Sequence, residues 1–279
     1  MTKSYLFTTK SNLHVGAGNS NYGVIDNLVQ RDPTDQFPTV FASSLKGAFR
    51  EYFKTKKGDT ETSKIFGGPD DGRSTFVLSE AHLLGLPVRS NKYPYLMATS
   101  PYLLRKFRTV IEEDYGLTMP SELKTVIEIL GKVSIDSETP LLIGETPAED
   151  LMIEDYTNIG RFPTQVNAAD DVLKSQLDLL FGIATTVVLL SDEDMAHQCS
   201  DYALPVLARN SLEDGRSTNL WYEQIVPREA VFYFILDAEN EKLTGLLDDK
   251  PIVQIGANAS IGYGRCRISN LTESNESNR

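Results

Sequence analysis

The stretch His14–Arg50, HVGAGNSNYGVIDNLVQRDPTDQFPTVFASSLKGAFR, holds the features around which the rest of the chain is interpreted. A glycine-rich turn comes first, followed by an acid between apolar residues, an Arg-Asp-Pro turn and the start of a helix. A helix start that offers backbone N–H groups, hydroxyls and a lysine can bind phosphate. Together these features predict a site for a polymer that carries phosphates.

The glycine-rich turn begins at Gly16 and Gly18 and continues to Gly23. Glycine tolerates positive φ and lets the backbone approach a ligand closely. The spacing is one residue longer than a dinucleotide fingerprint, and no Gly-Lys-Ser/Thr follows, so neither nucleotide-binding motif is present. A plain surface loop is the alternative interpretation.

Asp26 stands between apolar neighbours in the run Val24–Val29. A carboxylate in such a setting is either a structural group in an ion pair, for example with Arg31, or a functional group. The local sequence leaves both possibilities open.

The helix that follows is predicted to start at Ser43 and Ser44, whose hydroxyls can cap it. Leu45, Phe49 and Phe53 recur every four residues and are expected to face the core. Lys46 and Arg50 are also four residues apart and share a different face.

Composition is that of a globular protein, with 279 residues, 41% of them hydrophobic and 24% charged. The net charge of -12 argues against non-specific nucleic-acid binding by the whole surface, although a local basic groove remains possible. No apolar run is long enough for a membrane span, and the residues MTKSYLFTTK lack the features of a signal peptide. Cys199 and Cys266 lie far apart. We therefore expect a cytoplasmic protein with two free thiols and no membrane partner.

The rest of the chain alternates strand and helix patterns, which predicts an α+β fold. We expect an opening strand that runs from residue 5 through residue 15, a strand over 75–84 and another over 230–236. Residues 208–219, with an Asp214-Gly215 turn, are typical of a protruding hairpin. Residues 92–165 contain helix starts and an acidic irregular stretch, and are interpreted as an insertion in one domain over 1–269. The tail 270–279 is predicted to be disordered.

Several segments, in order, resemble the RAMP superfamily, and within it the repeated backbone subunit of type III-B, Cmr-type CRISPR effector complexes. The segments are 14–18, 23–26, 30–32, 43–50, 86–90, 99–105, 220–223 and 256–264. Each is weak alone, but the ordered series is fairly specific. Four positions depart from the family pattern: Phe41, Glu80, Ile225 and Ala257.

The resemblance implies a ferredoxin-like, RRM-type palm with a helical insertion and a thumb hairpin at about 205–222. It implies copies stacked in a filament along a guide RNA, together with other type III effector subunits and a single-stranded target RNA. The acid of the Gly-x-Ile-Asp element cleaves the target in this family, which assigns that role to Asp26. His14 and Glu223 are further catalytic candidates.

The same resemblance implies metal-dependent cleavage, with Mg²⁺ or another divalent cation at Asp26. One carboxylate is too few for a metal cage made by the protein alone, so RNA phosphates and water would complete the site. The residues expected to bind guide RNA come from the helix start, the glycine loops and one arginine: Ser43, Ser44, Lys46, Arg50, Gly16, Gly18, Gly256, Gly262, Gly264 and Arg89.

Two alternatives remain open at this point. One is a scaffold that binds guide RNA without cutting the target. The other is a RAMP endonuclease that processes precursor RNA as a monomer, and such enzymes commonly use a histidine near a glycine loop.

Overall fold

The computed structural model describes residues 1–18, 23–68, 72–162, 170–182, 185–239 and 241–271. Residues 19–22 of the glycine turn and 272–279 of the tail predicted to be disordered lie outside these ranges. Within them, no helix combines the length and the apolar character that crossing a membrane requires. Both cysteines are free, as predicted, and both are buried.

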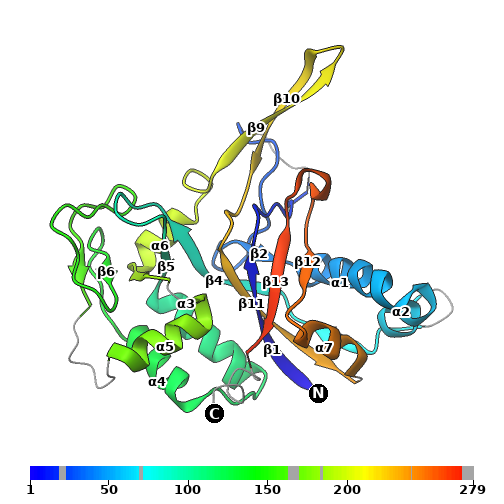
Figure 1. The fold of residues 1–279 in the computed structure, drawn as a ribbon, viewed down its shortest axis with the longest axis horizontal. Helices are drawn as coiled ribbons and strands as arrows, with labels where there is room; N and C mark the ends of the chain where they lie inside the picture. Colours follow the sequence, from blue (N-terminus) through cyan, green and yellow to red (C-terminus); the bar gives the residue numbers. More distant parts are fainter. Residues whose placement is uncertain (19–22, 69–71, 163–169, 183–184, 240, 272–279) are drawn as a thin grey trace.

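Four long strands form the centre of the structure (Figure 1). Their spatial order is β13 (Arg265–Asn270), β1 (Thr2–Thr9), β11 (Val231–Ala238) and β4 (Ala81–Val88), and all neighbours are antiparallel. Helix α1 (Ala42–Lys57) lies between β1 and β4 in the sequence, and α7 (Glu241–Asp248) lies between β11 and β13.

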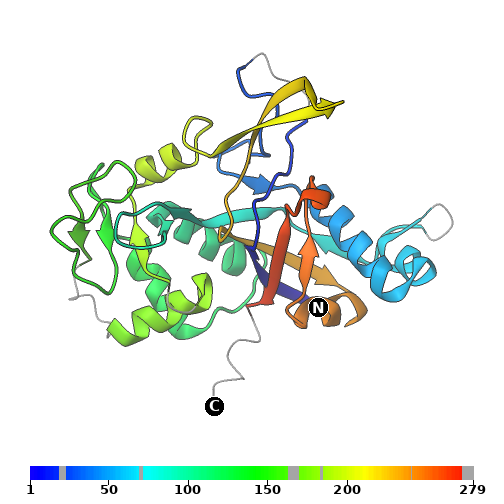
Figure 2. The same ribbon diagram turned by 45° about the horizontal axis from the view of Figure 1, so that its top comes forward.

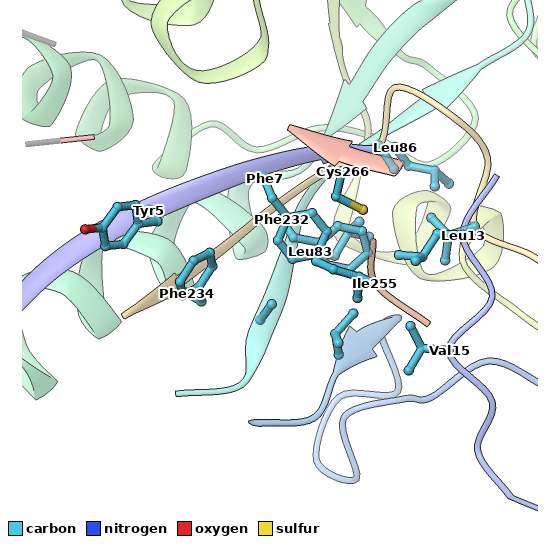
Figure 3. Close-up of a cluster of buried hydrophobic side chains, with 14 of the residues drawn as sticks. Tyr5, Phe7, Leu13, Val15, Leu83, Leu86, Phe232, Phe234, Ile255 and Cys266 are labelled. Carbon is cyan, nitrogen blue, oxygen red and sulfur yellow. The ribbon is translucent and has the colours of Figure 1, made fainter. Parts of the chain in front are cut away.

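Successive side chains of a strand point to opposite sides. In β1, β4 and β11 both sides are mostly buried, whereas Arg265 and Arg267 of β13 are exposed on one side. Tyr5 and Phe7 of β1 lie opposite Phe234 and Phe232 of β11, and the facing rings stack at 5.3 and 4.9 Å. Figure 3 shows these rings packed with Cys266 and other apolar side chains. Leu45, Phe49 and Phe53 of α1 belong to this cluster, as their spacing predicts.

A second apolar cluster covers the other face of the same strands. It contains Leu6 of β1 and Tyr233 of β11. The helices that pack there are α3 (Pro101–Arg108), α4 (Ser121–Gly131) and α5 (Asp170–Phe181), whereas α2 (Asp59–Phe66) packs on the α1 side. Both faces of β1, β11 and β4 are therefore covered, and one face of β13 is exposed at Arg265 and Arg267.

Shorter strands extend the sheet at both edges. One edge ends at β12 (Ile252–Gln254), and the other continues through β5 (Leu96–Thr99), β8 (Val187–Leu189), β6 (Leu141–Leu142) and β7 (Gly160–Arg161). In addition, β2 (Thr39–Val40) pairs with β4 and β3 (Phe76–Leu78) with β11. The segment 92–165 thus adds strands to the main sheet as well as α3, a π-helical turn over Thr109–Asp114 and α4.

A two-stranded hairpin projects from the body and forms a sheet of its own (Figures 1 and 2). It consists of β9 (Val206–Glu213) and β10 (Arg216–Gln224). Asp214 and Gly215 have φ of 52° and 76° at its tip, which is the tight turn that this dipeptide favours. Helix α6 (Asp192–Gln198), capped by Ser191, precedes the hairpin.

Three local predictions were wrong. Helix α1 begins at Ala42 with Phe41 at its N-cap and no side-chain cap, and the Ser44 hydroxyl instead accepts a hydrogen bond from Gln30. The strand expected over 75–84 is divided at Ser79, which hydrogen-bonds both the N–H and the C=O of Ile235. The opening strand ends at Thr9, and Leu13 makes only an isolated bridge with Val226.

Candidate functional site

Asp26 lies at the base of the projecting hairpin, against β10. Its backbone N–H and that of Asn27 both donate to the Tyr222 carbonyl, at 3.1 Å each. In return, the Tyr222 N–H donates to Asp26 Oδ2 at 2.7 Å. Asp26 is exposed. An exposed carboxylate that is held by a backbone donor is well placed to meet a ligand in a fixed orientation.

Arg31, the ion-pair partner suggested for Asp26, bonds elsewhere. Its guanidinium pairs with Asp201 at 2.9 Å and donates to the Cys199 carbonyl at 2.6 Å. Arg31 therefore joins the Arg-Asp-Pro turn to the segment that leads into β9.

Glu223, the next residue after Tyr222, points into the protein and is only 3% exposed. Its carboxylate accepts hydrogen bonds from Asn258 Nδ2 at 2.7 Å and from an Arg209 nitrogen at 3.3 Å. His14 is also buried, and its Nε2 lies 4.0 Å from Glu223 Oε2. His14 Nδ1 lies 2.7 Å from the Gln224 carbonyl, and because a carbonyl only accepts, Nδ1 carries a proton.

The two glycine loops meet at His14. The His14 carbonyl accepts the Ala257 N–H at 2.9 Å. Gly256 has a φ of 78°, and a Cβ at this position would stand 2.4 Å from the same carbonyl oxygen. Only glycine fits this close approach without a shift of the backbone. The structure therefore brings Gly256 against His14 and Val15, which directly precede the first glycine turn, although the two segments are far apart in the sequence.

A groove of about 680 Å³ runs between α1 and strand β12. Its walls carry predicted RNA-binding residues from both sides, and they are mainly apolar. The lining residues are Ser43, Ser44, Gly47, Ala48, Glu51, Tyr52, Thr55, Lys56, Ile252, Gln254 and Gly256.

Lys46 and Arg50 share a face of α1, as predicted, but they are directed to a different loop. Lys46 Nζ donates to the Ser74 hydroxyl at 3.0 Å and lies 5.5 Å from the centre of the Phe76 ring. Arg50 donates to the Gly67 carbonyl at 2.8 Å. The sequence predicted one site for these two cations and the two serines. In the structure they lie on two sides of the helix.

The other predicted RNA-binding residues lie at the surface or in loops. Arg89, with 85% of its side chain exposed, pairs with Glu154 at 2.7 Å beyond the end of β4. Gly18, Gly262 and Gly264 all have positive φ. Gly264 also donates its N–H to the Asn12 carbonyl at 2.8 Å, which fixes the end of its loop to the segment before His14.

A charged network below the Arg-Asp-Pro turn was not predicted. Lys106 of α3 donates to Asp32 at 2.8 Å and to Asp35 at 2.7 Å. Burial by itself raises the pKa of Asp32, but the hydrogen bonds from Lys106 and the Thr34 N–H lower it on balance. Burial and the Lys106 charge lower the pKa of His82 to about 4, although Asp32 and Asp35 oppose the shift. This network fixes the turn to the helical side of the sheet.

The donors for a metal ion are few. Among the residues described, no group of three or more His, Cys, Asp and Glu side chains could hold one. Asp26 by itself supplies oxygen ligands of the type that Mg²⁺ prefers, and Mg²⁺ is commonly held by one or two carboxylates with phosphates and water. The donor set fits a metal that RNA completes, and it does not fit a site made by protein alone.

The RAMP superfamily model matches residues 6–267 of the chain. The chain therefore belongs to the RAMP superfamily.

Two curated relatives cover nearly the whole chain. The CRISPR system Cmr endoribonuclease Cmr4 of Pyrococcus furiosus is 25% identical over 300 residues, which cover 96% of this chain and 95% of that protein. The CRISPR system CMR subunit Cmr4 of Saccharolobus solfataricus is 23% identical, with 88% of this chain and 87% of that protein covered.

Solved structures share the fold. A chain in the cryo-EM structure of the Type III-B Cmr-beta bound to cognate target RNA has a TM-score of 0.77 and 20% identity, with 98% of each chain covered. Oligomeric Cmr4 from Pyrococcus furiosus, a crystal structure, has a TM-score of 0.68 and 20% identity, with 96% of this chain and 99% of that chain covered.

Arg209, Asn258, Lys106 and His82 were missed by sequence reasoning. Arg209 and Asn258 each lie within a segment that was singled out, the hairpin and the second glycine loop. An asparagine among glycines in a loop is a signal for left-handed backbone, and Asn258 has a φ of 64°. No local signal pairs Lys106 with a turn that lies 71 residues earlier at Asp35.

Proposed function

We propose that this chain is a backbone subunit of a type III-B CRISPR effector, and that it binds guide RNA and cleaves complementary target RNA through Asp26. The observation that carries the proposal is the exposed Asp26 carboxylate, held by the Tyr222 N–H at the base of a projecting hairpin. Similarity to Cmr4 proteins over almost the whole chain, one of them named an endoribonuclease, supports the same conclusion.

The four strands β13-β1-β11-β4, with α1 and α7 in the connections, follow the βαββαβ order of a ferredoxin-like palm. We assign the palm to them and the thumb to β9 and β10. The helices α3, α4 and α5 cover most of the second face of the sheet, so we place guide RNA elsewhere. The groove between α1 and β12 offers the alternative, with Ser43, Ser44 and Gly256 in its walls.

RNA supplies its own nucleophile for cleavage. The 2′-hydroxyl attacks the adjacent phosphorus, a bond from O2′ to phosphorus forms, and the bond from phosphorus to O5′ breaks. The products are a 2′,3′-cyclic phosphate and a 5′-hydroxyl, whose oxygen takes its proton from water. The Asp26 carboxylate is assigned the proton that leaves O2′, and the Tyr222 N–H orients that carboxylate. A divalent cation held by Asp26 with RNA phosphates would supply positive charge at the reacting phosphate.

The test is to assemble the subunit with guide RNA and its partner subunits, and to compare the wild type with Asp26→Ala. We expect target cleavage to be lost while guide binding persists. Intact cleavage by Asp26→Ala would exclude Asp26 as the catalytic acid. Absence of cleavage in the wild type as well would favour the scaffold, and a wild-type monomer that cuts a precursor hairpin RNA would favour the processing enzyme.

A further inference from the structure

Asn258 connects the second glycine loop to the hairpin with both ends of its side-chain amide. Its Oδ1 accepts a hydrogen bond from Arg209 at 2.7 Å, and its Nδ2 donates to Glu223 at 2.7 Å. The backbone of Asn258 is left-handed, with a φ of 64° and a ψ of 28°, a conformation that asparagine tolerates better than most residues. The loop backbone thus presents the amide to both hairpin strands.

Glu223, Arg209 and Asn258 form one hydrogen-bonded group. A buried carboxylate is costly unless its charge and its hydrogen bonds are satisfied. Arg209 lies 3.3 Å from both Glu223 oxygens, and its guanidinium stacks over the Trp221 ring at 5.2 Å. Arg209 and Trp221 are cross-strand partners in β9 and β10, so the hairpin itself orients the cation.

The same strand carries the contact with Asp26. Tyr222 precedes Glu223, and successive residues of a strand face opposite ways. The Tyr222 N–H and carbonyl hold Asp26, and the Gln224 N–H donates to the Asn27 carbonyl at 2.9 Å. A displacement of Glu223 therefore displaces the donors that orient Asp26.

We propose that Glu223, Arg209 and Asn258 act as a clasp, which fixes the base of the hairpin to the loop 256–264 and so sets the position of the Asp26 carboxylate. Asn258 is a positioning residue. The inference rests on the proposed function, in which the loop contacts guide RNA and Asp26 acts on the target. Contact of guide RNA with the loop would then be transmitted to the cleavage acid.

The experiment replaces Asn258 by glycine, which keeps the left-handed backbone accessible and removes both side-chain hydrogen bonds. Glu138→Gly is the matched control, because Glu138 also has a positive φ, of 61°, is exposed, and bonds Asp194 of α6 through its N–H. Two quantities are measured in the assembled complex. They are the single-turnover rate of target cleavage and the hydrogen-exchange protection of the Tyr222 amide, with β1 and β11 as internal references.

For Asn258→Gly we expect a cleavage rate lower by roughly tenfold to a hundredfold, the effect of a small misplacement of a catalytic group. Protection of the Tyr222 amide falls, whereas protection of β1 and β11 is unchanged. Glu138→Gly behaves as the wild type. Arg209→Lys, which keeps the charge and loses the planar fork, shows a smaller change in the same direction.

Wild-type cleavage together with wild-type exchange at Tyr222 in Asn258→Gly would overturn the clasp. Asp26→Ala, measured in parallel, separates this failure from that of the proposed function. If Asp26→Ala cuts normally, the assignment of Asp26 fails. The exchange measurement still decides whether the clasp orders Tyr222, because it needs no cleavage.

Discussion

Asp26 and Glu223 are two acids at the base of one hairpin, and they differ in exposure and in hydrogen-bond partners. Asp26 is exposed and accepts a hydrogen bond from the backbone N–H of Tyr222. Glu223 is buried and is bonded by Arg209 and Asn258. The first can reach a ligand, and the second can hold its surroundings in place. We therefore assign the cleavage step to the exposed Asp26, and the positioning of the site to the buried Glu223.

The largest effect is expected for Asp26→Asn, which removes the proton acceptor and keeps the shape. Loss of a general base typically costs about 10²–10⁴-fold in rate, so single-turnover target cleavage should fall by that amount. Glu223→Gln, the equivalent change at the buried acid, keeps an oxygen for Asn258 and should cost less than about tenfold. Equal losses of cleavage rate in the two variants would contradict the different roles assigned to Asp26 and Glu223.

The stability of the isolated subunit should depend strongly on the buried acid Glu223. Glu223→Ala leaves Arg209 and Asn258 without their acceptor, and we expect the free energy of unfolding to fall by about 2–4 kcal/mol. Glu229→Ala, which removes a surface partner of Lys10, should cost less than about 1 kcal/mol. Urea unfolding measures both, and a Glu223→Ala protein as stable as Glu229→Ala would show that the buried pair contributes nothing.

Low pH should destabilise the folded protein through His82, which lies 3.6 Å from Asp32 in the Lys106 network. Burial, together with the Lys106 charge, lowers the pKa of His82 from its usual 6.5 to about 4. The unfolded chain therefore binds the extra proton first, so the stability is complete above pH 6.5 and is lost as the pH falls toward 4. At about 1.4 kcal/mol for each pKa unit, the loss is on the order of 3 kcal/mol.

The measurement is the free energy of unfolding against pH for the wild type, His82→Gln and the exposed control His197→Gln. His82→Gln should lose much of the dependence between pH 6.5 and 4, and His197→Gln should keep it. An unchanged dependence in His82→Gln would contradict the burial argument.

The smallest effect on stability is expected for Arg89→Ala. Its ion pair with Glu154 lies at the surface, so the free energy of unfolding should change by less than about 1 kcal/mol. If Arg89 contacts a guide phosphate, the slope of log affinity against log salt should fall by about one. A fluorescence binding titration over a range of salt concentrations measures that slope, and an unchanged slope removes Arg89 from the RNA contacts.

Periodic apolar residues predicted the parts of the fold that local sequence determines. Leu45, Phe49 and Phe53 are buried on one face of α1, and the Asp214-Gly215 turn closes a hairpin. The predicted helix cap was wrong because the helix begins at Ala42, before both serines, and the Ser44 hydroxyl bonds Gln30. Tertiary contacts of this kind carry no local signal.

The candidate site was predicted in part for the same reason. The sequence and its family resemblance indicated His14, Asp26 and Glu223, and the structure places all three around the base of the hairpin. Their division into an exposed acid and a buried network depends on which side of β10 each contacts. The side of β10 that a residue contacts is set by strand register, and local sequence patterns do not specify the register of an exposed hairpin.

The most direct test is a structure of the assembled complex that carries Asp26→Asn, with guide RNA and uncut target RNA bound. Our account predicts residue 26 beside a target phosphate, within hydrogen-bond reach of the 2′-hydroxyl either directly or through one water. It also predicts that Glu223 remains buried against Arg209 and Asn258. The account is contradicted if residue 26 faces away from the target and another acid occupies the place beside the scissile phosphate.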